Sequence, residues 1–307
     1  HGGGIYCDWS SPNLTNVTLS GNSSNNMGGG IASYNSALVI ENSLLENNSS
    51  YEMGSAIYCY GNYDGDSLKI ITTTISNNIQ IFPYGHTGAA LYITDNSYVV
   101  IRNSIIWGNT HDYNVSDPFI DAYDSVSTVD VYYSNVNGRS TSNIEYNYNE
   151  PMVGPGNINS NPLFCGGDYT LAENSPCVGT GQNGANMGAF GVGCEAHIPI
   201  LHVATTGSDD NDGSEENPFA TIPKALDVSF DGDTILVHPG TYYRADSIES
   251  EIVHKSLTIM STGGQDSTFL TLSEDQDYGM FRIQGGPENE IQVSLKGFTI
   301  SKFTLEV

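Results

Sequence analysis

The stretch of this 307-residue sequence best suited to bind a metal ion is the acidic turn DDNDGSEEN at residues 209–217. The side chains of Asp209, Asn211 and Asp212 would supply oxygen ligands beside a glycine that permits a tight turn. Ca²⁺ prefers such oxygen ligands. The turn lacks a clear bidentate glutamate at the distance that a full Ca²⁺ loop requires, so a solvated turn is the simpler interpretation. Ca²⁺ is nevertheless the one cofactor that the sequence suggests.

The overall charge limits the partners of the protein. The chain has 9 Lys and Arg residues against 35 Asp and Glu residues, a formal net charge of −26. This field repels the phosphates of nucleic acids and anionic membrane surfaces, so we expect no nucleic-acid partner. The sequence contains no apolar run of about 18 residues, so we also expect no membrane insertion by a helix.

The first third of the chain repeats itself, and Ile5, Ile31 and Ile57 are spaced by 26 residues. One line of the repeat reads GGGIYC (2–7), GGGIAS (28–33), GSAIYC (54–59) and GAALYI (88–93). Two aliphatic columns would form the core: Ile5, Ile31, Ile57 and Leu91 in one, and Leu19, Leu45, Ile75 and Ile106 in the other. Extra residues fall in polar turns, which is typical of a solenoid.

Apolar and polar residues alternate within each period, as in LTNVTLS (14–20), ALVIENSLL (37–45) and YVVIRNSII (98–106). Alternation bounded by Gly, Asn and Ser predicts short β-strands rather than helices. Successive coils would pair in parallel, and the crossover rule makes the winding right-handed. The sequence therefore predicts an all-β fold, a right-handed parallel β-helix.

An asparagine ends the second line of the repeat in all four coils, at Asn22, Asn48, Asn78 and Asn109. Stacked at one corner, each side-chain amide could bond to the amides of the neighbouring coils, which satisfies polar groups that would otherwise be buried unpaired. Asparagine also tolerates the left-handed backbone conformation that a sharp corner needs. We therefore interpret these residues as a structural ladder and not as a catalytic site.

The five cysteines suggest an oxidising compartment. Cys7 and Cys59 occupy the same repeat position two coils apart, about 9–10 Å by the strand spacing, which is too far for a disulfide. Cys165, Cys177 and Cys194 lie 12 and 17 residues apart, which matches no zinc pattern. We expect a disulfide between two of these three, and their spacing does not decide which two.

The pairing of a GG[AG]I line with an [FLI]xxN line resembles the repeats of polymorphic outer-membrane protein passengers. More widely, it is similar to secreted right-handed β-helix proteins of the pectate-lyase-like type. The resemblance covers residues 1–110 well and residues 111–165 loosely. It implies a secreted or surface-displayed protein, and many members of these families are adhesins or structural stalks.

Many proteins of this fold cleave polysaccharides, so the resemblance raises the question of catalysis. Polyuronate lyases need a basic residue beside carboxylates that hold Ca²⁺, but Lys69, Arg102 and Arg139 are expected to lie far apart in the repeat. Hydrolases need several aspartates on adjacent coils, and no such stack occurs at matching positions. His86 and His111 fall in turns. We therefore expect no enzymatic activity, and a polysaccharide lyase or hydrolase ranks third among the functions.

The chain divides into three parts. The coils of residues 1–165 are followed by residues 166–196, which resemble the segment that closes many secreted β-helix domains. Residues 197–307 resemble the opening of such a domain, where a short helix near 219–228 plugs the core. Its apolar face would contain Ala220, Ile222, Ala225 and Leu226. The order of coils, closing segment, cap and coils indicates a circular permutation of one β-helix domain.

The two ends of the sequence align with each other in phase. FTIS (298–301) aligns with VTLS (17–20), which places Ile300 opposite Leu19. If Val307 of one copy continued into His1 of the next, Ile300 and Leu19 would be 26 residues apart, one period. A contact between unlike ends that does not close on itself produces a filament. We therefore expect copies to join head to tail, as a tandem array or as stacked subunits.

These observations favour a non-enzymatic structural protein, extracellular or at the cell surface, whose units join into a β-helical filament or stalk. Its partners would be other copies of itself. The alternative is a surface adhesin or carbohydrate-binding β-helix that binds glycans or a host surface. That function would use aromatic residues in the insertions, namely Trp9, Tyr60, Tyr63 and Tyr84.

Overall fold

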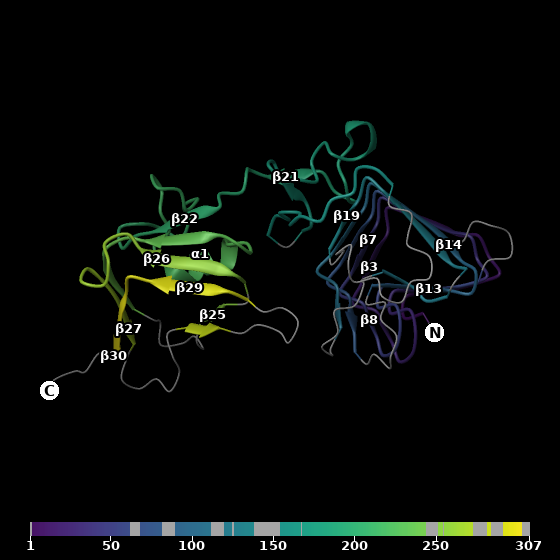
Figure 1. Ribbon diagram of the computed structural model, residues 1–307, viewed down its shortest axis with the longest axis horizontal. Coiled ribbons are helices and arrows are strands. Elements are labelled where there is room, and N and C mark those ends of the chain that lie inside the picture. The colour runs from purple at the N-terminus through teal and green to yellow at the C-terminus, as the bar shows by residue number, and fades with distance from the viewer. Residues whose placement is uncertain are drawn as a thin grey trace. The chain divides into compact units, whose positions relative to one another are not determined.

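The computed structural model forms two compact units, His1–Ala196 (unit 1) and His197–Val307 (unit 2) (Figure 1). It describes residues 2–61, 68–81, 90–111, 120–124, 126–137, 154–166, 168–243, 251–253, 255–272, 281–283 and 291–302. The fold is all-β, a parallel β-solenoid of about 8 turns with a single short helix in the described chain. The predicted fold class is therefore confirmed.

Unit 1 consists of coils whose strands pair in parallel in four sheets, A to D. Sheet A contains β1 (Ile5–Asp8), β5 (Ile31–Tyr34), β9 (Ile57–Tyr60), β13 (Leu91–Thr94) and β17 (Ile120–Ala122). Sheet B contains β2 (Asn13–Thr15), β6 (Leu38–Glu41), β10 (Leu68–Ile71), β14 (Tyr98–Arg102) and β18 (Thr128–Tyr132). Sheet C contains β3 (Thr18–Ser20), β7 (Leu44–Glu46), β11 (Thr74–Ser76), β15 (Ile105–Trp107) and β19 (Asn135–Val136). Sheet D contains β4 (Ser23–Ser24), β8 (Ser49–Ser50), β12 (Ile79–Gln80) and β16 (Thr110–His111).

Two aliphatic columns run through the coils of unit 1. In sheet A, Ile31 pairs in register with Ile5 on one side and Ile57 on the other, and Leu91 follows Ile57. In sheet C, the register joins Leu19, Leu45, Ile75 and Ile106 in the same way. All eight belong to one core cluster or pack against it. Repeated burial of the same positions is what fixes the register of each coil.

The asparagines Asn22, Asn48, Asn78 and Asn109 form a continuous ladder beside sheet C. In each of the first three, Nδ2 donates to the Oδ1 of the asparagine on the next coil, over 2.9 Å, 2.9 Å and 2.8 Å. Each backbone N–H also donates to that same Oδ1, over 3.0 Å, 2.9 Å and 3.0 Å. The last three members are buried, so these bonds replace the water that the amides lose on folding.

The ladder asparagines do not themselves make the corner. The left-handed residue lies one position earlier, at Gly21, Asn47, Asn77 and Gly108, with φ of 66°, 51°, 54° and 67°. The expectation that the ladder residue adopts this conformation was wrong, because its backbone N–H must point along the axis to reach the next coil. Glycine and asparagine are suited to the position before the ladder residue because they adopt a positive φ at little energetic cost.

A second polar ladder, between sheets B and C, was not anticipated from the sequence. The N–H of Ser43 donates to Thr73 Oγ1 over 3.4 Å, Thr73 N–H to Ser104 Oγ over 3.2 Å, and Ser104 N–H to Ser134 Oγ over 3.1 Å. Ser134 N–H continues the ladder to Asn157 Oδ1 over 3.0 Å. Each hydroxyl group thus caps the backbone at the same corner of successive coils.

The segment that follows the coils lies against their side. It contains the short strands β20 (Leu171–Ala172) and β21 (Val192–Cys194) and the 3₁₀ turn η1 (Gln182–Gly184). Met187 and Cys177 are buried against Ile105, on the outer side of sheet C. Gly188 N–H donates to the backbone oxygen of Asn103 over 2.7 Å. The segment therefore shields a side of the solenoid that its own coils leave apolar.

Cys165 and Cys194 form the disulfide, with their Cα atoms 6.0 Å apart. The expected disulfide is thus confirmed, and Cys177 is the cysteine left over. Its buried thiol accepts a hydrogen bond from Asn135 Nδ2 over 3.1 Å. Cys7 and Cys59 are buried free thiols, as expected from the coil spacing. Burial raises the pKa of the Cys59 thiol to about 12, so it is protonated and unreactive at neutral pH.

Unit 2 continues the parallel pairing in three sheets, E to G. Sheet E contains β22 (Ile200–Val203), β23 (Thr234–Val237), β26 (Leu257–Ser261) and β29 (Val293–Lys296). Sheet F contains β24 (Gly240–Tyr243), β27 (Thr268–Leu272) and β30 (Thr299–Lys302). Sheet G contains β25 (Glu251–Val253) and β28 (Phe281–Ile283).

The helix α1 (Ile222–Val228) begins three residues later than the predicted start at 219. Phe219 forms a β-bridge with Val203, and the Thr221 side chain accepts the N–H of Lys224 as the N-cap. Ala220 therefore lies outside the helix, which corrects its predicted place on the apolar face. The other three predicted residues of that face, Ile222, Ala225 and Leu226, are buried in the core of unit 2.

Candidate functional site

The first coil of unit 1 leaves its core partly open. Its inward-facing residues Ile5, Leu14 and Leu19 are only partly buried, although they pack on the core. Their partners on the second coil, Ile31, Ile40 and Leu45, are fully buried. The strands β1 to β4 are also the outermost strands of their four sheets in the described chain. This end of unit 1 thus offers apolar side chains together with unpaired backbone edges.

The last described strands of unit 2 leave a second open face. Leu295 of β29 pairs in register with Ile259, and Ile300 of β30 pairs with Leu270. Ile259 and Leu270 are fully buried, whereas Leu295 is 38% exposed and Ile300 is 51% exposed. Leu295 and Ile300 thus continue the core columns of unit 2. Among the described residues, none stacks on their outer side.

The two open faces have the same corner. Two residues separate β29 from β30, and the first of them, Gly297, has a φ of 75°. Two residues also separate β2 from β3, and the first of them, Asn16, has a φ of 56°. Superposing these corners places Leu295 at the position of Leu14 and Ile300 at that of Leu19. Two coils whose turns have the same number of residues and the same left-handed residue can pair without a shift in register.

The predicted junction residues are therefore placed only in part. Ile300 and Leu19 each lie on an open face, at equivalent positions of the coil. His1 and Val307 lie outside the described residues. The apolar face of the first coil and that of the last described strands are the candidate functional surfaces of the chain.

The acidic turn is folded back on its own backbone. Asp209 accepts the N–H groups of Ala220 and Thr221 over 3.0 Å and 2.9 Å, and also the Thr221 hydroxyl over 2.8 Å. Asn211 Nδ2 donates to the backbone oxygen of Pro218 over 2.9 Å. The backbone N–H of Ser214 lowers the pKa of the Asp212 carboxyl. These bonds position the loop that enters α1, and Ca²⁺ binding by this turn stays a prediction.

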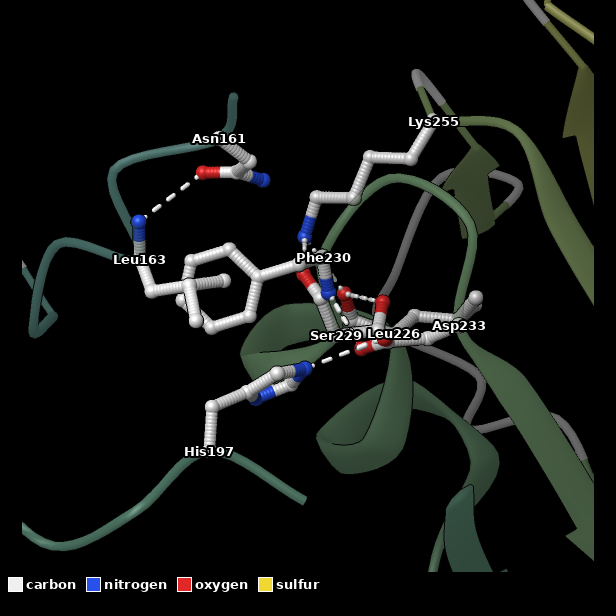
Figure 2. Close-up of polar contacts among 8 residues, drawn as sticks. All are labelled: Asn161, Leu163, His197, Leu226, Ser229, Phe230, Asp233 and Lys255. Atoms are coloured by element: carbon white, nitrogen blue, oxygen red, sulfur yellow. Dashed lines mark hydrogen bonds and ion pairs between the residues drawn. The ribbon is translucent and has the colours of Figure 1, made fainter. Parts of the chain in front are cut away.

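A polar cluster holds the end of α1 (Figure 2). The Lys255 ammonium group donates to the backbone oxygens of Leu226 and Ser229, over 2.9 Å and 2.6 Å, at the helix C-terminus. A cation there satisfies carbonyl groups that the helix leaves unpaired. Burial lowers the pKa of Lys255. Within the same cluster, His197 Nε2 lies 3.0 Å from Asp233 Oδ1, and the Asp233 carboxylate also accepts the Phe230 N–H over 2.6 Å.

Five tyrosines form an aromatic row along the outer face of sheet A. Successive ring centroids are 5.6 Å, 5.5 Å, 5.8 Å and 5.7 Å apart, in the order Tyr6, Tyr34, Tyr58, Tyr92 and Tyr123. Ala32 occupies the register position that would otherwise carry the second ring, and Tyr34, two residues along the same face, fills the gap. Sequence reasoning missed this row because its members do not share one repeat position.

The aromatic residues predicted for the alternative function are partly accessible. Trp9 is 67% exposed and Tyr60 is 36% exposed, and the Tyr60 ring lies 5.6 Å from that of Tyr34 in the tyrosine row. Tyr63 and Tyr84 lie outside the described residues. Aromatic faces of this kind are suited to contact the apolar face of a sugar or another flat surface.

The basic residues of the repeats lie closer together than expected. Lys69 of β10 is in register with Val100, two residues before Arg102 on the next coil. Both side chains belong to the outer face of sheet B, because their neighbours along the strands are buried in the core. The expectation that they lie far apart was wrong, since an insertion between the coils changed the apparent spacing. The Arg102 guanidinium lies 5.2 Å from the centre of the Tyr132 ring.

The other residues weighed for catalysis contribute little. Arg139 and His86 lie outside the described residues, and His111 lies in β16 of sheet D, with its side chain not described. In the described part of the chain, no group of three His, Cys, Asp or Glu side chains is arranged to hold a metal ion. None of the described helices has the length and apolarity to cross a membrane.

Comparison with known families gives one match. Residues 205–252, which include the acidic turn, α1 and β23, match the family described as "Protein of unknown function (DUF1565)". This family is associated with β-helix repeat proteins. No curated protein and no solved structure matches the chain. The DUF1565 match thus agrees with the solenoid fold, and it covers the capped start of unit 2.

Proposed function

We propose that this protein is a non-enzymatic structural β-solenoid whose copies join end to end, extracellularly or at the cell surface, into a filament or stalk. The open face at β29 and β30 of one copy would receive the first coil of the next copy. Leu295 would then stack on Leu14, and Ile300 on Leu19. Backbone pairing across the joint would continue sheets B and C of unit 1 into sheets E and F of unit 2.

The observation that carries the proposal is the shared corner of the two open faces, together with their exposed aliphatic columns. Each face is apolar where the other is apolar, and both have a left-handed residue at the same turn. Burying aliphatic surface stabilises a contact by about 25 cal/mol per Å². The open strand edges add backbone hydrogen bonds, and edges of this kind pair readily with another chain. Because the two faces differ, repeated contacts of this type produce a linear polymer.

The test compares the assembly of three forms of the full chain by sedimentation velocity and negative-stain imaging. The wild type should form fibres with a regular axial repeat. Ile300→Asp should remain dispersed, because the carboxylate would be buried at the joint. Val126→Asp is the matched control, since Val126 is 57% exposed and precedes β18, at the opposite edge of sheet B from β2. A dispersed wild type, or an Ile300→Asp variant that assembles normally, would contradict the proposal.

A second candidate function is glycan binding by the exposed aromatic residues of sheet A. Trp9 and Tyr6, which are 67% and 52% exposed, support it because an accessible aromatic face can contact the apolar face of a sugar. Binding to a glycan array that is lost in Trp9→Ala, without polymer formation by the wild type, would favour this function. Release of unsaturated uronates or reducing ends from a polysaccharide would overturn both proposals and point to Lys69 and Arg102.

A further inference from the structure

Two histidines of unit 2 lie side by side on the outside of sheet E. His202 belongs to β22, whose residues Leu201 and Val203 are buried in the core. His238 directly follows β23 and is next to the buried Val237. Because side chains alternate along a strand, both imidazoles project from the outer face of the sheet. The parallel register brings His202 opposite Leu236, two residues before His238.

The two rings face each other through their nitrogens. His202 Nδ1 lies 3.0 Å from His238 Nε2, and the ring centroids are 5.3 Å apart. A Zn–N bond is about 2.0–2.1 Å, so two nitrogens on one Zn²⁺ are separated by roughly 3.3–3.4 Å at a tetrahedral angle. At the right angle of a square-planar ion such as Cu²⁺, the same bond lengths give about 2.8–3.0 Å. The observed separation of 3.0 Å therefore matches two nitrogens at a right angle on one ion, and it is shorter than a tetrahedral Zn²⁺ requires.

The surroundings also favour a cation. The hydrogen bond joins one nitrogen of each ring, and its accepting nitrogen carries no proton, so that ring already offers the lone pair that metal ligation requires. Glu215 and Glu216 interact electrostatically with His202, which places negative charge close to the pair. Both carboxylates are exposed, and the loop that carries them is bonded to β22 by the His202 N–H and Gly213 oxygen, 2.8 Å apart.

We propose that His202 and His238 form a binding site for a late first-row transition-metal dication, such as Cu²⁺, Ni²⁺ or Zn²⁺. The ion replaces the hydrogen bond between the rings. The ring that donates that bond transfers its proton to its other nitrogen, so both rings stay neutral and each offers a lone pair. Water fills the remaining positions, and Glu215 and Glu216 supply an attractive field. Imidazole ligands select these ions over Ca²⁺ and Mg²⁺.

The test is isothermal titration of the untagged full chain with Zn²⁺, Ni²⁺ or Cu²⁺, and with Ca²⁺ for comparison. We expect each chain to bind one ion through His202 and His238, and we expect Ca²⁺ not to compete for this site. His202→Gln and His238→Gln should each weaken binding by at least about 10–100-fold, the loss associated with removing even an outer-shell partner. Glu215→Gln with Glu216→Gln should weaken it only about 2–5-fold, because the pair acts through space. His111→Ala, in unit 1, is the matched control and should bind as the wild type does.

Two further readouts keep the result independent of folding. Circular dichroism should show the same fold in the variants without metal, and Cu²⁺ bound to the wild type should give an electron paramagnetic resonance spectrum with nitrogen coupling. Absence of saturable binding, absence of nitrogen coupling, or unchanged binding in both histidine variants would overturn the proposal. The site does not rest on end-to-end assembly, so each proposal can fail while the other stands.

Discussion

Within the described residues, unit 1 is buried at its last coil and partly exposed at its first, whereas unit 2 is buried at its first strand and exposed at its last strands. In unit 1 the last coil is buried, as at Val131 and Val136, whereas Ile5, Leu14 and Leu19 of the first coil are only partly buried. In unit 2 the first strand is buried, as at Leu201 and Val203, whereas Leu295 and Ile300 of the last strands are exposed. The partly exposed strands thus lie at the start of unit 1 and at the end of the described part of unit 2.

The means of covering also differ. In unit 1, residues 154–158 bond to the last coil, and the segment joined by the Cys165–Cys194 disulfide shields the outer side of sheet C. In unit 2, the helix α1 and a turn held by Asp209 lie, along the chain, between the first two strands of sheet E. A solenoid coil is stabilised only by its neighbours, so an end coil needs a cover or a partner. The comparison shows that the last coil of unit 1 and the first strands of unit 2 are covered by structures of different kinds, and that the described residues provide no such cover for the first coil of unit 1 or the last strands of unit 2.

The largest expected effect is a difference in the stability lost when the same core position is truncated in an interior coil and in the first coil. Leu45→Ala should lower the free energy of unfolding by about 2–5 kcal/mol, because Leu45 is buried between two coils. Leu19→Ala, at the same column position, should cost only about 1 kcal/mol in the unassembled chain, because its outer side is open. Urea unfolding at a concentration below assembly measures both. Equal losses would mean that the first coil is covered after all.

The disulfide variant tests the cover of unit 1. Cys165→Ser with Cys194→Ser removes a link between residues 29 apart, which should cost roughly 3–4 kcal/mol by the chain-entropy model. Thermal unfolding of the full chain should therefore show a lower midpoint for unit 1 and an unchanged one for unit 2. If the variant unfolds at the wild-type midpoint, the disulfide does not stabilise unit 1.

The asparagine ladder gives a smaller difference in stability between an interior coil and the first coil. Asn78→Ala deprives the buried N–H groups of Asn48 of their acceptor and should cost about 2–3 kcal/mol. Asn22→Ala, at the open end, should cost about 1 kcal/mol, because Asn22 accepts from no earlier coil within the described chain. Chemical denaturation of the two variants side by side tests this. The reverse order would contradict the ladder as the source of stability.

The smallest effect concerns the cover of unit 2. Thr221→Ala removes the N-cap of α1 and should cost about 1 kcal/mol in the unfolding of unit 2. Thr221→Ser keeps the capping oxygen and should restore most of that loss. Amide hydrogen exchange in α1 would report the change locally. Equal protection in the alanine and serine variants would show that the cap does not hold the helix.

The sequence predicted the features that recur at fixed spacing. The columns through Ile31 and Leu45 and the asparagine ladder could be located because each coil repeats the same residue type at the same place. Features built from unlike residues could not be located in this way. The tyrosine row changes position at Ala32, and the hydroxyl ladder mixes Ser43 with Thr73. Both depend on which side chains project from the same face, which follows only from the register.

Features that occur only once in the chain could not be predicted from the sequence either. Nothing in the spacing of Cys165, Cys177 and Cys194 distinguishes the two that pair. The start of α1 was predicted too early because Ala220 fits the apolar face of a helix, yet Phe219 before it bonds to Val203 of β22 as a bridge. Lys69 and Arg102 looked distant because an insertion lengthened the coil between them, although β10 and β14 are neighbours.

The most direct measurement of end-to-end joining is a cross-link in register. If the two corners superpose, Lys296 of one copy lies opposite Thr15 of the next, and both side chains are exposed. A chain with Thr15→Cys and Lys296→Cys, oxidised and run on a non-reducing gel, should then give a ladder of covalent multimers. Val126→Cys with Lys296→Cys, which is out of register, should stay monomeric. A monomeric in-register variant, or equal cross-linking of both variants, would contradict the account.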